Sequence, residues 1–297
     1  MRIMLTGCNG QVGWELRRAL APLGEVIAFD RNGADLAKPE LLASVAASVR
    51  PHAIVNAAAY TAVDNAESDV DLAHCVNAEA VGVLAEAARK HNALMIHYST
   101  DYVFEGVSSQ PYVETDTVAP LNSYGISKLA GERAIESIGG DWLTLRTTWV
   151  YGCRGQNFLH TMLRLAGERE TLRVVADQTG SPTSARMIGD LTAHVLAKAQ
   201  RERLTGEFES GLFHMTAAGQ TTWHGFASAI VEAARASGKV AIKTNTIEPI
   251  GSDAWPTLAR RPKYSVLDNS KFDQRFGLAR LDWREGLALT LGDLLGQ

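Results

Sequence analysis

A tyrosine and a lysine four residues apart are the first candidates for chemistry in this chain. Tyr124 and Lys128 lie within Ser123–Arg133, whose residues suit a helix, so both side chains share one face. A free phenol has a pKa of about 10, and a nearby ammonium lowers it by stabilising the phenolate. The spacing therefore predicts a general acid, Tyr124, assisted by Lys128. Because chance alone gives roughly 0.2 such pairs in a chain of this composition, other motifs must support it.

Hydroxyl groups supply the second candidate. Leu94–Ser99 is short and apolar, as a buried strand is, and Thr100 and Asp101 follow it. Ligands bind at the carboxyl ends of parallel strands, where a hydroxyl would hold a substrate carbonyl and contact the tyrosine. A helix cap or a turn is the alternative interpretation. Two interpretations also apply to Asn56–Tyr60, whose small alanines either pack a strand or let a cofactor lie against the backbone.

Three glycines predict a phosphate-binding turn. Gly7, Gly10 and Gly13 follow the first predicted strand and open the first predicted helix. Glycine permits positive φ and close approach of a pyrophosphate, while N–H groups at the helix start face the phosphates. The spacing alone is a weak signal, and a purely structural turn is the alternative. Its place at the first strand–helix junction favours a dinucleotide site.

The end of the second predicted strand leaves the choice of cofactor open. Asp30 stands there, and a carboxylate at this point accepts hydrogen bonds from the adenosine ribose of NAD. Arg31 follows it, and a guanidinium there holds the 2′-phosphate of NADP. Because both residues are present, the sequence predicts NADPH or NADH without choosing between them.

The elements that must position these residues alternate along the first half of the chain. Short apolar runs predict strands, and apolar residues at three- and four-residue spacing predict helices between them. Strands are expected at Arg2–Thr6, Glu25–Asp30, Ala53–Ala59, Leu94–Ser99 and Trp142–Thr147, and helices at Val12–Leu23, Pro39–Val49 and Asp69–Lys90. This alternation predicts an α/β fold with a doubly wound, Rossmann-like parallel sheet.

The pattern loosens after residue 150, which predicts a division into two domains. Residues 1–150 are expected to form a dinucleotide-binding domain. Residues 151–297 are expected to form mainly a smaller, mixed α/β substrate domain, with parts of 177–216 returning to the first sheet. The elements expected there are helices around Ser184–Gln200, Trp223–Ala236 and Trp283–Leu295, and a strand near Leu212–Met215.

Composition narrows the class of protein. A formal charge of −4 over 297 residues argues against nucleic-acid binding, which needs a clustered basic surface. No apolar run approaches the ~18 residues of a membrane span, and the N-terminus lacks a signal-peptide pattern. Cys8, Cys75 and Cys153 fit neither a disulfide framework nor a zinc site. A cytoplasmic protein is expected. His97 is interpreted as a packing or surface residue and Trp223 as a core or domain-interface aromatic.

Taken together, these motifs resemble the dTDP-4-dehydrorhamnose reductase family of the extended short-chain dehydrogenase/reductase superfamily. The resemblance covers nearly the whole chain, and the Ser-Thr-Asp-Tyr-Val-Phe and Trp-Val-Tyr runs are more specific than Tyr-x-x-x-Lys. The segments that carry it are Gly7–Leu16, Val55–Glu67, His97–Phe104, Pro120–Glu132, Arg146–Tyr151, Asn157–Ala166, Asp177–Thr183 and Arg260–Pro262.

The resemblance implies a reaction and a set of contacts. NADPH or NADH would deliver hydride to the C4 ketone of dTDP-4-dehydro-L-rhamnose, giving dTDP-L-rhamnose. Tyr124 would protonate the developing alkoxide, Lys128 would lower the tyrosine pKa and hold the nicotinamide ribose, and Thr100 would position the carbonyl. The implied cofactor contacts are Gly7, Gly10, Gln11, Val12, Asp30, Arg31, Asp35, Leu36, Ala58, Ala59, Tyr60, Tyr98, Tyr124 and Lys128. The implied substrate contacts are Thr100, Asp101, Tyr102 and Trp149.

Two departures from the family pattern affect these expectations. Some members dimerise through magnesium held by acidic residues, and Glu15 is present here, but Arg186 stands where such a member has a glutamate. No metal site is therefore expected, and the chain is expected to be a monomer or a homodimer. The second departure is Lys263–Leu267, which differs from the family sequence after Arg260–Pro262 and would alter contacts to the nucleotide.

Two other functions compete with the reductase. An epimerase or dehydratase of the same superfamily would use tightly held NAD as a recycled hydride carrier. Dehydratases often carry an Asp-Glu pair after the strand-end threonine, whereas Tyr102 follows Asp101 here. A catalytically silent regulatory subunit would keep the fold and bind NADP, but it would have no need of the Tyr124–Lys128 pair.

Overall fold

A six-stranded parallel sheet forms the centre of the computed structural model, which describes residues 1–296. The strand order is β10-β5-β4-β3-β1-β2, and every neighbouring pair is parallel. The strands are β1 (Arg2–Thr6), β2 (Glu25–Phe29), β3 (Ala53–Asn56), β4 (Leu94–Thr100), β5 (Trp142–Thr147) and β10 (Gly211–His214). The chain order reverses between β1 and β3, which is where doubly wound sheets bind ligands. The predicted fold class is confirmed.

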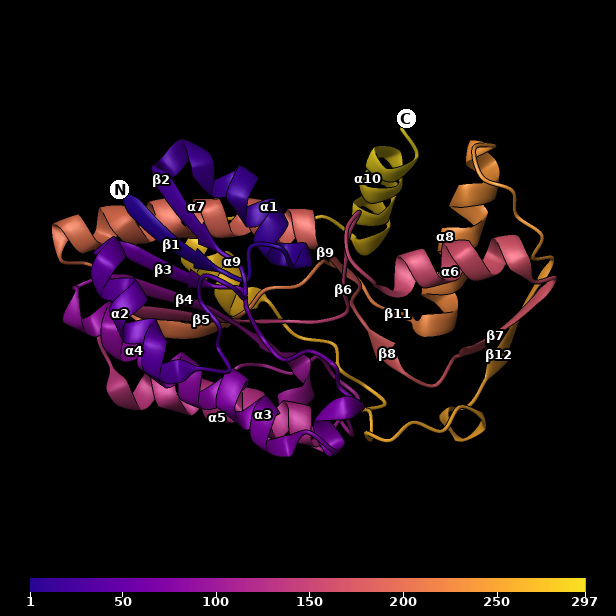
Figure 1. Cartoon of the computed structure of the whole chain (residues 1–297). Coiled ribbons are helices and arrows are strands. Elements are labelled where there is room, and N and C mark those ends of the chain that lie inside the picture. The colour runs from indigo at the N-terminus through magenta and orange to yellow at the C-terminus, as the bar shows by residue number, and fades with distance from the viewer. Residues whose placement is uncertain (297) are drawn as a thin grey trace.

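Helices cover both faces of the sheet (Figure 1). One face carries α1 (Gln11–Leu20) and α7 (Ala185–Thr205), and the other carries α2 (Pro39–Val49), α4 (Ala80–Lys90) and α5 (Ser123–Ile138). Alternation along the strands builds both cores, since Ile3 and Leu5 pack on the first side and Met4 on the second. All three side chains are fully buried. This two-sided burial explains why the strands read as continuous apolar runs.

One expected helix is interrupted. Asp69–Lys90 contains α3 (Val70–His74), a π-helical turn at Cys75–Glu79 and then α4. Asn77, within the turn, accepts a hydrogen bond from the backbone N–H of Tyr60 at 2.9 Å and donates to its carbonyl at 3.0 Å. A single widened turn of this kind is common near functional sites. Periodicity does not detect it, because apolar spacing continues on both sides.

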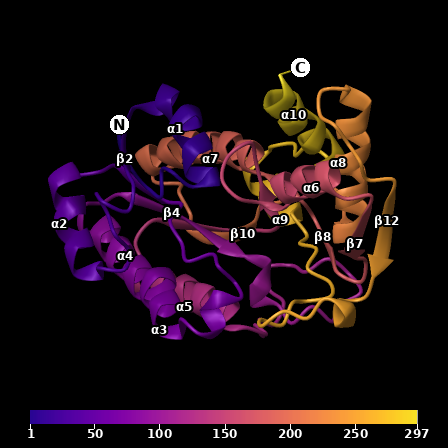
Figure 2. The same cartoon turned by 45° about the vertical axis from the view of Figure 1, so that its right-hand side comes forward.

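Many of the segments after residue 150 lie together at one end of the sheet, as α6, α8, β7 and β12 do in Figures 1 and 2. Three two-stranded sheets pair β12 with β7, β11 with β8 and β6 with β9. The elements are β6 (Val150–Tyr151), α6 (Phe158–Glu168), β7 (Thr171–Val175), β8 (Thr179–Gly180), β9 (Thr183–Ser184), β11 (Thr221–Thr222), α8 (Trp223–Ser237), β12 (Thr246–Ile250), α9 (Ser270–Phe276) and α10 (Trp283–Leu295). Short 3-10 turns lie at Ala21–Leu23, Asn65–Glu67, Asp101–Val103 and Ser252–Ala254.

The later elements were predicted unevenly. The α10 helix has the expected bounds, and α7, α8 and β10 lie close to theirs. The sequence analysis did not predict β7, β12, α6 or α9. The division into two domains at residue 150 stays a prediction, and α7 and β10 belong to the layers of the central sheet. Within residues 1–296, no helix is both long and apolar enough to cross a membrane.

Candidate active site

The glycine turn has the close contacts that its sequence predicts. Gly7 has φ +72°, and a Cβ there would lie 2.6 Å from the backbone nitrogen of Ala58. A Cβ on Gly13 would lie 2.0 Å from the carbonyl oxygen of Gly7. Gly10 is the N-cap of α1, so the first turn of that helix opens beside β1 and β3. The turn therefore brings unpaired helix N–H groups to the point where the sheet order reverses.

One cavity of about 950 Å³ is lined by every residue that the resemblance implied as a cofactor or substrate contact. It extends from the glycine turn of β1 to the ends of β4 and β5 and the start of α8. Its volume is at the upper end of the range for small-molecule sites. The cavity is also lined by residues that were not expected among the cofactor or substrate contacts, including Asn9, Thr61, Val63, Ser99, Thr147, Gln156 and Trp223.

At the β2 end of the cavity, the side chains of Asp30 and Arg31 have different environments. Asp30 Oδ1 accepts hydrogen bonds from the backbone N–H groups of Asn32 at 2.9 Å and Gly33 at 3.3 Å. Arg31 is 78% exposed, and its Nε lies 3.5 Å from Asp35 Oδ1. The carboxylate is therefore held by the turn, while the guanidinium is free to reach an anion.

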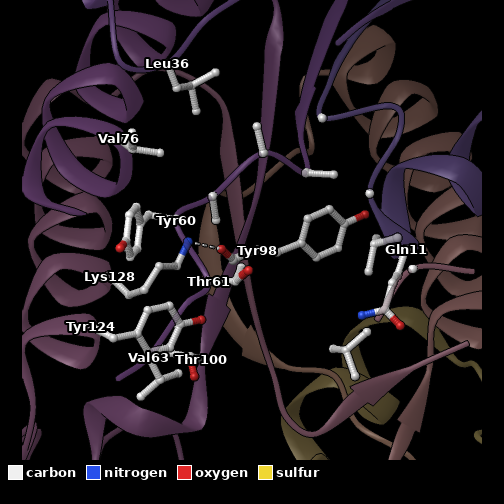
Figure 3. Close-up of a pocket in the computed structure, with 18 of the residues that line it drawn as sticks. Gln11, Leu36, Tyr60, Thr61, Val63, Val76, Tyr98, Thr100, Tyr124 and Lys128 are labelled. Carbon is white, nitrogen blue, oxygen red and sulfur yellow. Dashed lines mark hydrogen bonds between the residues drawn. The ribbon is translucent and has the colours of Figure 1, made fainter. Parts of the chain in front are cut away.

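Tyr124, Lys128 and Thr100 converge in the middle of the cavity, where Figure 3 shows them pointing into the same space. The first two lie on α5, whose N-cap Asn122 accepts a hydrogen bond from Gly125 N–H at 2.8 Å. Thr100 ends β4 and accepts from Tyr102 N–H at 3.1 Å. A capped helix and a central strand thus hold the three groups on rigid elements.

The pKa of Tyr124 is shifted in the direction opposite to the one expected from its spacing to Lys128. Burial raises the pKa of Tyr124 to about 12, opposed by the Thr100 hydroxyl and assisted by Asp101. Burial lowers the pKa of Lys128 to about 8 against the attraction of Glu132. Instead of lowering the tyrosine pKa, Lys128 donates to the Tyr98 carbonyl at 2.7 Å. Desolvation of the phenolate is the largest cause of the raised tyrosine pKa.

The acid after β4 is also buried. Asp101 is 2% exposed, and burial raises its pKa to about 6 against hydrogen bonds that include one from Thr100. The Oγ1 of Thr100 donates to Asp101 Oδ1 at 3.1 Å. Two other buried hydroxyls beside it, on Ser99 and Thr147, have no hydrogen-bond partner among residues 1–296. These hydroxyls at the cavity wall can form hydrogen bonds with a ligand.

Two indoles close the far end of the cavity. Trp149 and Trp223 stack with ring centroids 3.5 Å apart and an interplanar angle of 6°. Trp149 has φ +45°, a conformation rare for a bulky residue, and a Cβ on Gly180 would lie 2.5 Å from its ring. Trp223 donates from Nε1 to Gln178 Oε1 at 3.2 Å. Trp223 was expected as a core or domain-interface aromatic; its place in the cavity was not predicted, because nothing near it in sequence matches a motif.

The segment around Arg260–Pro262 crosses back to the first half of the chain. Arg261 forms two hydrogen bonds with Asp64, at 2.8 and 2.7 Å. The carbonyl of Arg260 accepts from Asn122 Nδ2 at 2.7 Å, at the cap of the helix that carries Tyr124. In the divergent part that follows, Tyr264 donates to Gln220 Oε1 at 3.1 Å. This segment therefore ties the C-terminal half to the start of α5.

Comparisons with known proteins agree with this geometry. The family model described as RmlD substrate binding domain matches residues 1–295. A dTDP-4-dehydrorhamnose reductase of Burkholderia thailandensis is 57% identical over 298 residues, covering 100% of both chains. The enzyme of the same name from Escherichia coli strain K12 is 47% identical, covering 99% of this chain and 98% of its own.

Solved structures extend the likeness to three dimensions. A Bacillus anthracis dTDP-4-dehydrorhamnose reductase in complex with NADP has a TM-score of 0.87 and 34% identity, covering 98% of this chain and 99% of its own. A Thermus thermophilus UDP-glucose 4-epimerase in complex with NAD has a TM-score of 0.79 at 21% identity, covering 100% of this chain and 99% of its own, and shows the fold alone. The expected resemblance is confirmed, and the chain belongs to the dTDP-4-dehydrorhamnose reductase family.

Proposed function

We propose that this protein uses NADPH or NADH to reduce the C4 ketone of dTDP-4-dehydro-L-rhamnose to dTDP-L-rhamnose. The observation that carries the proposal is the convergence of Tyr124, Lys128 and Thr100 in one cavity with the glycine turn. The names of relatives that match over nearly their whole length support the same substrate. Substrate-dependent loss of the reduced-nicotinamide absorbance band, with the dTDP-ketosugar supplied, tests the reaction directly.

The residues present fit a dinucleotide. The backbone at Gly7 and Gly13 leaves no room for a Cβ, and the α1 N-terminus opens beside it. The proposed contacts along the cavity are those expected from sequence, from Gln11 and Val12 to Tyr98. When bound, the reduced cofactor supplies a hydride. Unpartnered hydroxyls on Ser99 and Thr147 are available to whatever lies beside them.

Residues of the protein then stabilise the negative charge that forms on the ketone oxygen and supply its proton. Hydride addition to a ketone creates an oxyanion, so the site must supply a proton where the charge develops. Tyr124 is the proposed proton donor, because its raised pKa of about 12 keeps the phenol protonated through neutral pH. Thr100 orients the carbonyl, and Lys128 supplies a cation when it takes up a proton. Asp101, Tyr102 and Trp149 are proposed to contact the sugar nucleotide.

Cofactor preference gives a first prediction. Arg31→Ala is expected to raise the KM for NADPH by roughly tenfold or more and leave that for NADH nearly unchanged, because a charge-assisted hydrogen bond contributes about 1.5–3 kcal/mol. The exposed guanidinium next to Asp30 motivates it. The control is Arg201→Ala, which removes an exposed arginine on α7, away from the cavity. Equal weakening of both cofactors would remove Arg31 from this role.

Metal dependence gives a second prediction. Arg186 forms an ion pair with Asp293, and Arg18 contacts both Glu15 and Asp190. Because arginines already engage these acids, activity is expected to survive exhaustive chelation unchanged. Steady-state rates before and after chelation, and after addition of magnesium, provide the measurement. Loss of activity that magnesium restores would contradict the prediction.

The two competing functions receive less support. An epimerase or dehydratase would return its hydride to the sugar, so it would show no net loss of reduced cofactor. A silent regulatory subunit would bind NADP without turnover. The placing of Tyr124 and Thr100 in the cavity favours a proton-transfer enzyme over the silent subunit. We also propose a monomer or homodimer, and a cytoplasmic location that the three free cysteines support.

A further inference from the structure

A buried row of polar side chains leads from the sheet to Lys128. Thr6 Oγ1 on β1 donates to Asn56 Oδ1 on β3 at 2.6 Å. Asn56 Nδ2 lies 3.1 Å from His97 Nδ1 on β4, and His97 Nε2 lies 3.1 Å from Lys128 Nζ. Each of the four side chains is at most 2% exposed. Polar groups buried this deeply in a sheet cost free energy unless they are matched donor to acceptor.

The orientation of Asn56 is fixed by a backbone group. Its Oδ1 lies 3.2 Å from the nitrogen of Ala58, whose N–H can only donate. The amide oxygen must therefore face Ala58, and the amide NH₂ must face His97. Thr6 does not disturb this arrangement, because a hydroxyl can either donate or accept.

The orientation of Asn56 in turn sets the tautomer of His97. Because Asn56 donates to Nδ1, that nitrogen must be the acceptor. A neutral imidazole carries one N–H, which is then on Nε2 and points at Lys128. Burial holds the pKa of His97 well below its usual value, so the ring stays neutral.

We propose that Asn56 and His97 are positioning residues that present an N–H to Lys128 and thereby favour its uncharged amine. A neutral amine accepts from His97 Nε2–H and donates to the Tyr98 carbonyl at 2.7 Å, which satisfies both contacts. An ammonium has only donors, so it would face the imidazole N–H and lose one contact. The ammonium of Lys128 is therefore less stable than that of a lysine in water, in line with its pKa, which burial lowers to about 8.

The other ionisable groups around the pair do not supply this effect. Glu132 on α5 favours the ammonium, but Arg146 on β5 holds its carboxylate through hydrogen bonds of 2.8 and 2.7 Å. Neither Tyr124 nor Asp101 is among the causes of the lowered Lys128 pKa. His97 is thus the ionisable group whose contact with Lys128 opposes the ammonium.

Nitrogen NMR of protein labelled with ¹⁵N-histidine reads the tautomer directly. In the wild-type protein at neutral pH, we expect His97 to carry its proton on Nε2, with the resonance assigned through His97→Gln. His214 is an internal reference for the other tautomer. Its Nδ1 lies 3.1 Å from the carbonyl of Asp268, which only accepts, so its proton is expected on Nδ1. A proton on Nδ1 of His97, or a charged ring, in the wild-type protein would overturn the proposal.

The variant Asn56→Asp should reverse the tautomer of His97. A carboxylate accepts from His97 Nδ1–H, leaves Nε2 as an acceptor and so favours the ammonium of Lys128. We expect the tautomer to switch and the pKa of Lys128, followed by ¹³C NMR of labelled lysine, to rise by about one unit or more. Asn122→Asp adds a buried carboxylate at the cap of α5 without touching His97, and should leave the tautomer unchanged. An unswitched tautomer in folded Asn56→Asp would refute the mechanism.

The consequence for turnover rests on the proposed function. If the charged Lys128 assists reduction, the alkaline limb of the kcat/KM profile should move to higher pH in Asn56→Asp by the same one unit or so. A switched tautomer with an unmoved limb would refute the assisting role of Lys128 in turnover. The NMR result itself stands apart, because it needs neither substrate nor cofactor.

Discussion

Tyr124→Phe is expected to lower kcat by about 10²–10⁴-fold, the range that general acid catalysis contributes. The hydroxyl points into the cavity beside Thr100, and its removal leaves the oxyanion without a positioned proton donor. The ring itself is retained, so the packing of α5 and the edge-to-face contact with Tyr102 are preserved. Cofactor affinity should therefore change little. Steady-state kinetics and a cofactor titration measure the two effects separately.

A control variant and two contrary outcomes sharpen that expectation. Tyr264→Phe removes an exposed hydroxyl that contacts Gln220, outside the cavity, and should turn over nearly as the wild type does. Near wild-type turnover by Tyr124→Phe itself would show that another group donates the proton. Loss of cofactor binding together with kcat would instead indicate a structural defect.

The second large effect concerns stability beneath the site. Glu132→Leu is expected to lower the free energy of unfolding by about 3–5 kcal/mol, because it leaves a buried guanidinium without its counter-ion. Arg146 is 3% exposed and Glu132 6%, and they form a bidentate pair. Arg146 also lies over the ring of Phe104, with its guanidinium carbon 5.1 Å from the centroid. Denaturant unfolding followed by circular dichroism gives the free energy.

The matched control replaces both partners. Glu132→Leu/Arg146→Met substitutes apolar side chains of similar size, and it should recover most of the lost stability since no charge is left buried. A double variant at least as unstable as Glu132→Leu would show that the pair's packing, rather than charge pairing, stabilises this layer.

The sequence predicted the parts of the site that lie in local motifs. Gly7 and Gly13 have contacts that exclude a Cβ, and Tyr124 and Lys128 share one helix face, because turn geometry and helix periodicity are set by nearby residues. The carboxyl edge of the sheet then brings these motifs and Thr100 together. Topology, not local pattern, made that convergence predictable.

What escaped prediction depends on contacts between distant segments. His97 lies in an apolar strand and was interpreted as a packing or surface residue, but its ring contacts Asn56 and Lys128. Trp223 meets Trp149 only because α8 returns to the cavity. The expected lowering of the tyrosine pKa by Lys128 does not hold here, because burial depth is not readable from spacing.

Transfer of a labelled hydride tests the central claim most directly. With reduced cofactor deuterated on the transferred position of nicotinamide C4 and dTDP-4-dehydro-L-rhamnose as substrate, mass spectrometry and NMR of the product locate the label. The account predicts one deuterium at C4 of the rhamnosyl ring for each cofactor oxidised. Product without label, or a bound cofactor that substrate never oxidises, would contradict it.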